Sequence, residues 1–213
     1  DGIRDCLLSR GLGDVYKRQL RGRSHDILAT ERLLLNILSH LSGISTLTHN
    51  IVKIAKEANP NVEILATRKT LPGFRALEKE AVLHGGGQTH RMRLDDAILI
   101  KDNHLKLSKS IKESISLSRA KYPDLMLEVE ADNEEQALEI AECGADRVML
   151  DNFTPQDAAK TIKKLRQISN IEIEISGGVT IENVAEYAKN TDFISLGSLT
   201  MSSLPVDFSL HVI

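Results

Sequence analysis

The sequence predicts an α/β fold: a TIM-like parallel (β/α) barrel of about six to seven strands, complete or incomplete. Short β-rich runs recur along the chain and amphipathic helical stretches separate them, which is the pattern of a parallel sheet. Two further observations favour a barrel over an open doubly wound sheet. Nearly every β-rich run ends in a polar or charged residue, and a barrel gathers such ends around one mouth. The run 171–176 also places Glu172, Glu174 and Ser176 on one face, which a polar barrel interior can hold.

The first expected element is a long helix over residues 30–57. Its apolar residues follow one stripe, which is expected to face the core: Leu33, Leu34, Ile37, Leu38 and Leu41. Gly43 lies within this helix, and it is expected to interrupt the helix or to separate two helices.

Six strands follow, and helical or turn-forming sequence separates them. They are expected at 62–67, 97–102, 125–131, 147–152, 171–176 and 193–198. Two of the intervening helices carry clear end signals. The helix 133–144 ends at Gly144, a residue suited to a helix C-terminus. The helix 154–168 starts with Thr154 as its cap and Pro155 at its first position.

The composition limits the class of protein. The 213 residues suit one domain, and the net charge of −3 argues against a general affinity for nucleic acid. The sequence contains no run of about 18 apolar residues, so no membrane span is expected. Its N-terminus does not have the pattern of a signal peptide. Two cysteines, Cys6 and Cys143, do not make a disulfide framework, which indicates a reducing, cytoplasmic environment.

Residues 1–19 differ in character from the rest of the chain. They show no sustained helical or strand period, and the stretch GDVYKRQ resembles translated library-adapter sequence. We therefore expect residues 1–19 to be a non-native leader, although a native disordered leader is the alternative. The barrel domain is then expected over 20–200, and a separate C-terminal segment over 201–213.

Glycine-rich turns follow the last two expected strands. The first turn is Ser176, Gly177 and Gly178, and the second is Leu196, Gly197 and Ser198. Backbone N–H groups of such paired loops form the phosphate site of many barrels. The alternative is that the glycines only make tight turns. Because the two motifs occur at consecutive final strands, the sequence favours a phosphate site.

Cationic residues gather at the ends of the first two strands. The segment 67–70, Thr-Arg-Lys-Thr, ends the first strand, while His90, Arg91 and Lys101 mark the second. A single such residue is usually a solvated charge, but several at one mouth indicate a ligand with multiple negative charges. The glycines 85–87 are expected to let a loop approach that ligand.

Two acids, Glu130 and Asp151, end the third and fourth strands at the same rim. Carboxylates beside an anion site hold Mg2+ together with substrate oxygens, or accept hydrogen bonds from sugar hydroxyls. Neutralisation of the nearby lysines is an equally good reading of these residues alone. A zinc site made of His84, His90 and His104 is not expected because their spacing matches no helical pair and no thiolate lies near them.

Several motifs then resemble one known family. They occur in one order along the chain: ERLLLNILSHLSGIST (31–46), TRKTLPGFRALEKEAVLHGGGQTHRMRLDDAILIKDNH (67–104), LEVEADNEEQALE (127–139), VMLDN (148–152) and ISGGVTIENV (175–184). Together they resemble quinolinate phosphoribosyltransferase, the carboxylating nicotinate-nucleotide pyrophosphorylase, over about residues 28–210. The resemblance implies transfer of phosphoribose from phosphoribosyl pyrophosphate to quinolinate with decarboxylation, in de novo NAD biosynthesis. The products would be nicotinate mononucleotide, pyrophosphate and CO2.

The same resemblance implies a role for each matching residue. The quinolinate pocket would comprise Thr67, Arg68, Lys69, His90, Arg91 and Lys101, with Arg32 supplied by the neighbouring subunit of a homodimer or higher oligomer with shared active sites. Lys101, Glu130 and Asp151 would be catalytic, and the two acids would face the ribose and its Mg2+. The 5′-phosphate would bind at the two glycine-rich turns.

Three departures from the family pattern bear on this expectation. The family's N-terminal α+β domain is expected to be absent, so the segment 206–210 would lack its strand partner. Met201 stands where the family often has histidine, and Arg93 stands where a small or apolar residue is common. The alternatives are a catalytically incompetent fragment of this enzyme, the related molybdenum-transport-associated protein, or a nicotinate-specific transferase. The intact KDNH motif at 101–104 argues against the molybdenum-associated protein.

Overall fold

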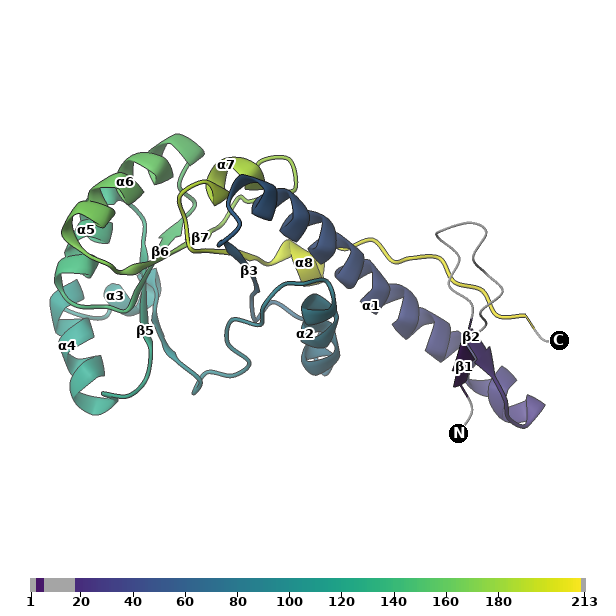
Figure 1. The fold of residues 1–213 in the computed structure, drawn as a ribbon. Helices are drawn as coiled ribbons and strands as arrows, with labels where there is room; N and C mark the ends of the chain where they lie inside the picture. Colours follow the sequence, from purple (N-terminus) through teal and green to yellow (C-terminus); the bar gives the residue numbers. More distant parts are fainter. Residues whose placement is uncertain (1–2, 6–17, 212–213) are drawn as a thin grey trace.

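The computed structural model describes residues 3–5 and 18–211. Residues 1–2, 6–17 and 212–213 lie outside this description, and with them lies most of the expected leader. Two three-residue strands, β1 (Ile3–Asp5) and β2 (Arg18–Leu20), pair with each other in antiparallel orientation. In Figure 1 this pair lies near the start of the long helix α1, away from the main sheet.

The main sheet has six parallel strands in the order β3-β8-β7-β6-β5-β4. They are β3 (Glu63–Ala66), β4 (Ile98–Ile100), β5 (Leu127–Ala131), β6 (Arg147–Asp151), β7 (Glu172–Ser176) and β8 (Phe193–Leu196). From β4 to β8 each strand pairs with the next, and β8 returns to pair with β3. Gln88 adds a parallel bridge to Leu65 on the other side of β3. This is the cyclic order of a barrel, with a seam between Gln88 and β4, and it confirms the predicted fold.

Helices alternate with the strands along the chain. They are α2 (Arg75–His84), α3 (Asp102–Leu105), α4 (Ile111–Lys121), α5 (Glu134–Glu142), α6 (Pro155–Ile168), α7 (Val184–Ala188) and α8 (Ser198–Met201). Figure 1 shows α4, α5 and α6 together along the outer side of the sheet. The predicted end signals are present: the Thr154 hydroxyl accepts the Asp157 N–H, and Gly144 has a φ of 83° after α5. Among the described residues, no helix combines the length and the hydropathy that crossing a bilayer requires.

The strands divide their side chains between an apolar face and a polar face. Successive residues of a strand point to opposite faces. The apolar set is fully buried and belongs to the hydrophobic core: Val129, Val148, Leu150, Ile173, Ile175 and Ile194. The alternate positions on the same strands include Glu128, Glu130, Glu174 and Ser195, which are also buried. The polar set therefore occupies the concave interior of the sheet, where it can serve a site.

Helix α1 (Ser24–Ala58) runs through Gly43 without interruption, so the expected break is wrong. Gly43 instead lies where the backbone of the C-terminal segment comes very close to the helix. A Cβ on this residue would lie 2.1 Å from the carbonyl oxygen of Leu204, in the C-terminal segment. Nearby, the N–H of Val206 donates to the carbonyl of Ser39 at 3.0 Å. The glycine therefore lets the C-terminal segment lie against the helix, as Figure 1 also shows.

The leucine stripe of α1 does not face the core as expected. Leu33 is 65% exposed, and Leu34 and Leu38 are each 42% exposed. The buried residues of the helix lie mainly in its second half, for example Ile44 and Ile51. Figure 1 shows why: the first half of α1 extends beyond the sheet. Periodicity identified an apolar face but not how much of the helix the sheet would cover.

Candidate active site

A cavity of about 750 Å3 lies at the carboxyl ends of the strands. Its lining includes thirteen of the residues proposed from the sequence: Thr67, Arg68, Lys69, His90, Arg91, Lys101, Asp151, Ser176, Gly177, Gly178, Leu196, Gly197 and Ser198. Glu130 lies next to this set, because its carboxylate pairs with Lys101. Arg32 does not line the cavity, and it is exposed on the first half of α1. The structure therefore brings together every proposed residue except the one expected from a neighbouring subunit.

The cationic side of the cavity contains two arginines with unsatisfied donors. The Nε atoms of Arg68 and Arg91 are buried and have no hydrogen-bond partner. Arg91 uses one other nitrogen, Nη1, to donate to the carbonyl of Ala97 at 3.2 Å. Buried polar groups normally have partners. Both side chains also line the cavity, and guanidinium groups there suit an anionic ligand.

The glycines 85–87 do not line the cavity themselves. A Cβ on Gly85 would lie 2.6 Å from the Ser45 carbonyl of α1, and one on Gly87 would lie 2.8 Å from Val82. These glycines therefore pack the loop against α1 and α2. Close packing lets Gln88 bridge to β3, so that the next residues, His90 and Arg91, enter the mouth.

The expected phosphate side has left-handed backbone at two adjacent glycines. Gly177 and Gly178 have φ angles of 78° and 66°, which other residues rarely adopt. A Cβ on Gly177 would lie 2.2 Å from Oδ1 of Asn152. Across the cavity mouth, a Cβ on Gly197 would lie 2.9 Å from the Lys69 side chain. The backbone angles favour glycine at positions 177 and 178, and this conformation suits a tight turn as well as a phosphate site.

Three carboxylates gather beside Lys101. Oxygens of Glu130, Asp132 and Asp151 lie within 4.8 Å of one another. Burial raises the pKa of Asp151, and the neighbouring Glu130 raises it further. A set of carboxylate oxygens suits a hard cation such as Mg2+. Asp132 is a member that the sequence reasoning missed.

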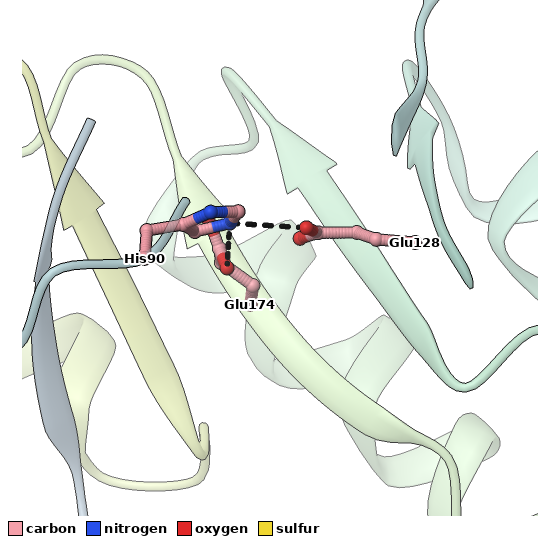
Figure 2. A group of neighbouring side chains, drawn as sticks. All are labelled: His90, Glu128 and Glu174. Atoms are coloured by element: carbon pink, nitrogen blue, oxygen red, sulfur yellow. Dashed lines mark ion pairs between the residues drawn. The ribbon is translucent and has the colours of Figure 1, made fainter. Parts of the chain in front are cut away.

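A second buried cluster lies deeper in the barrel, and Figure 2 shows its three side chains converging. Nε2 of His90 lies 3.0 Å from Glu128 and 3.2 Å from Glu174. Burial alone would lower the pKa of His90, but the two carboxylates raise it to about 9. Burial raises the pKa of Glu128, with Glu174 as the next cause. The cluster therefore retains a proton at neutral pH, which belongs to the group rather than to one residue.

Neighbouring groups balance the charge of this cluster. Arg147 Nη1 lies 3.2 Å from Glu174, so a guanidinium compensates one of the two carboxylates. The N–H of Arg91 lies 2.8 Å from Nδ1 of His90, which links the cluster to the cavity. The sequence reasoning placed Glu174 in the barrel interior and missed Glu128. The period of two in 127–131 could have found it, because it puts Glu128 and Glu130 on one face.

The fold and the cavity together define a class of protein. A parallel barrel whose mouth joins unsatisfied arginines, left-handed glycine turns and a carboxylate cluster is typical of barrel enzymes that act on phosphorylated, polyanionic substrates. The comparison with known families is more specific. Residues 44–211 match the family described as quinolinate phosphoribosyl transferase, C-terminal domain. The chain belongs to this family.

Named relatives support the same assignment. A probable nicotinate-nucleotide pyrophosphorylase [carboxylating] of Archaeoglobus fulgidus is 47% identical over 205 residues, which cover 94% of this chain and 78% of the relative. The rat nicotinate-nucleotide pyrophosphorylase [carboxylating] is 40% identical over 93% of this chain and 67% of its own. The crystal structure of NadC from Streptococcus pyogenes has a TM-score of 0.84 and 36% identity, covering 92% of this chain and 68% of that one.

Proposed function

We propose that this protein transfers the phosphoribosyl group of phosphoribosyl pyrophosphate to quinolinate and releases CO2 and pyrophosphate. The product is nicotinate mononucleotide, a precursor of NAD. One observation carries the proposal most directly: a single cavity joins two arginines with orphan donors to left-handed glycine turns and a carboxylate cluster. Family membership supports it independently, since the curated relatives bear the name of a carboxylating nicotinate-nucleotide pyrophosphorylase.

The cationic side would bind quinolinate, a pyridine ring with two adjacent carboxylates. Each of the two carboxylates needs its own cationic partner. A guanidinium suits this role because it presents two parallel N–H donors to the two carboxylate oxygens. Arg68 and Arg91 each have an unused Nε for this purpose. His90 would line the quinolinate pocket as well. Lys69 and Lys101 would neutralise the negative charge of the pyrophosphate.

The opposite side would bind the phosphoribosyl donor. Backbone N–H groups around Gly177, Gly178 and Gly197 would hold the 5′-phosphate. Glu130 and Asp151, assisted by Asp132, fit Mg2+ because they present converging carboxylate oxygens. When bound there with the substrate, the ion would compensate the charge of the pyrophosphate.

The chemical steps require positioning and charge compensation rather than a covalent enzyme intermediate. The bond between ribose C1 and the pyrophosphate oxygen breaks, and its electron pair leaves with pyrophosphate. Glu130 and Asp151 would stabilise the positive charge that develops on the ribose. The pyridine nitrogen then bonds to C1. When CO2 departs, the cationic ring stabilises the electron pair left at C2, and a proton from solvent replaces the lost carboxylate there. Arg68 and Arg91 would orient the ring for attack.

We also propose a homodimer with shared active sites. Arg32 is exposed on the first half of α1 and does not line this chain's own cavity. The leucines around it are exposed as well. A neighbouring copy that covers this face would bury the leucines and could bring Arg32 to its cavity.

Substitution of one arginine tests the quinolinate pocket. We expect Arg91→Ala to weaken quinolinate binding by about 10- to 100-fold, because a charge-assisted hydrogen bond to a buried carboxylate contributes about 1.5–3 kcal/mol. Isothermal titration calorimetry measures the change. Arg93→Ala is the matched control, since Arg93 is 72% exposed in its side chain and pairs with Asp95. Equal affinities for all three proteins would contradict the assignment.

A further inference from the structure

Lys79 is a buried lysine that none of the proposed roles uses. It lies on α2, it is 1% exposed, and it is the bulkiest of the fully buried side chains. Its Nζ donates to three backbone carbonyls: Ala66 at 3.2 Å, Thr89 at 3.0 Å and Arg91 at 2.5 Å. A lysine is almost never fully buried without partners, and here every partner is backbone.

The three carbonyls belong to the two segments that form the cationic side of the cavity. Ala66 is the last residue of β3 and directly precedes Thr67 and Arg68. Thr89 and Arg91 flank His90 in the loop that follows α2. In the described part of the chain, two backbone hydrogen bonds join these segments: the Ala66 N–H donates to the Gln88 carbonyl, and the Gln88 N–H donates to the Ile64 carbonyl. The ammonium continues that connection beyond the strand end, where the site residues lie.

We propose that Lys79 is a positioning residue for the dicarboxylate half of the pocket: its ammonium ties the end of β3 to the segment 89–91 and so sets the spacing between Arg68 and Arg91. The inference rests on the proposed function, because it concerns how that pocket grips quinolinate. Lys79 itself does not line the cavity.

The contact requires the charged form of the side chain. An ammonium has three N–H donors for three carbonyls, whereas a neutral amine has two donors and a lone pair that would face the third carbonyl. Burial, with the charges of Arg75, Arg68 and Arg91, lowers the pKa of Lys79 to about 8. Asp96, which precedes β4, acts in the opposite direction. The adjacent Glu78 is engaged elsewhere, with His40 and the N–H of Leu71.

The lowered pKa of Lys79 argues against a role that only fills space in the core. A folded-state pKa below the ordinary value means that the charged form is disfavoured by folding. An apolar side chain of the same length would avoid that cost but would leave three carbonyls without this donor. The charge is therefore best explained by what it holds in place.

The test compares Lys79→Met with the wild-type protein in the full chain. Methionine keeps the length and removes the ammonium. The matched control is Lys164→Met, because Lys164 is 45% exposed in its side chain and pairs with Glu134 on the outer helices. Three quantities are measured: the KM for quinolinate, the KM for phosphoribosyl pyrophosphate, and hydrogen exchange over residues 67–70 and 88–92.

We expect Lys79→Met to raise the KM for quinolinate by about 10- to 100-fold, because displacement of about 1 Å in a positioned site has effects of this size. The KM for phosphoribosyl pyrophosphate should rise by less, since Lys69 is the one residue of these two segments that would reach that substrate. Exchange should accelerate over 67–70 and 88–92, and the Lys164→Met control should match the wild type. Equal rises in both KM values, or unchanged exchange in the two segments, would overturn the proposal.

A pH series separates Lys79 from His90. In the wild type the KM for quinolinate should begin to rise near pH 8, as the ammonium loses its proton, and rise again near pH 9. Lys79→Met should lack the first rise and keep the second. A retained first rise would contradict the proposal. If the wild type neither binds nor converts quinolinate, the proposed function fails, while the exchange data still decide whether Lys79 holds the two segments.

Discussion

His90 shows how individual side chains of the barrel interior depend on one another. Its ring nitrogen lies between Glu128 and Glu174, and its other nitrogen faces the N–H of Arg91. A change of charge in this cluster would therefore reach the pocket through the backbone of Arg91. Because the cluster is buried, its charge is weakly screened by solvent.

The stability of the protein should depend on pH through His90. Its folded pKa of about 9 exceeds the ordinary value of 6.5, so its stabilising contribution is fully present below pH 6.5. That contribution is lost as the pH rises through about 9. We expect His90→Gln to lower the free energy of unfolding more at pH 6 than at pH 9.5, because the substitution removes the partner with which Glu128 and Glu174 share their proton.

Urea denaturation of both proteins across this pH range measures the difference. His84→Gln is the control because the His84 side chain is 72% exposed, and it should show no such trend. A difference between wild type and His90→Gln that stays constant from pH 6 to 9.5 would refute the role of the proton.

The sequence predicted the site residues whose position is determined by the end of a strand. It did not predict those whose position is determined by tertiary packing. Thr67, Lys101 and Asp151 lie at or next to the ends of parallel strands, so the barrel alone brings them together. Lys79 gave no such signal, because a lysine in an amphipathic helix normally faces solvent. Its burial follows from the approach of the loop 85–91, which no local pattern encodes.

At the scale of elements, all six strands of the main sheet were predicted within a few residues. The long helix was predicted at 30–57, but its continuity through Gly43 was not. Strand positions follow from short apolar runs between turn signals, which are local. Gly43 instead packs against the C-terminal segment, about 160 residues later in the chain. A glycine in a helix can mark a break or a close contact, and only the tertiary structure distinguishes the two.

We expect Gly43→Ala to destabilise the protein by about 1–3 kcal/mol, the usual cost of overpacking, because its Cβ would clash with the backbone of Leu204. Thermal denaturation measures this effect. Gly22→Ala is the control, since a Cβ there would meet only Ile27 at an ordinary 3.6 Å. An equal or higher melting temperature for Gly43→Ala would show that the C-terminal segment does not lie against α1.

At the scale of the whole molecule, the first half of α1 extends past the barrel with apolar residues exposed (Figure 1). Leu28, Leu33, Leu34 and Leu38 are each at least 42% exposed. The sequence predicted the barrel and its mouth, but it could not predict which surfaces remain uncovered, because that depends on how far each helix extends beyond the sheet.

Shared active sites predict complementation between two inactive variants. Arg32→Ala would impair the site of the partner, and Lys101→Ala would impair its own site. In a mixed dimer, one site combines both defects and the other has neither, so activity should recover toward about one quarter of wild type for random mixing of equal amounts. Each variant is assayed alone and after co-refolding. No recovery in a verified mixed dimer would contradict a shared site.

The central claim is that the barrel mouth joins quinolinate to a phosphoribosyl donor and removes one carboxylate. The most direct measurement follows CO2 released from quinolinate labelled in its 2-carboxylate, with phosphoribosyl pyrophosphate and Mg2+ present or omitted. The account predicts CO2 and nicotinate mononucleotide in equal amounts, only when the donor is present, and loss of both products in Lys101→Ala. Product formation from nicotinate in place of quinolinate, or CO2 release without the donor, would contradict it.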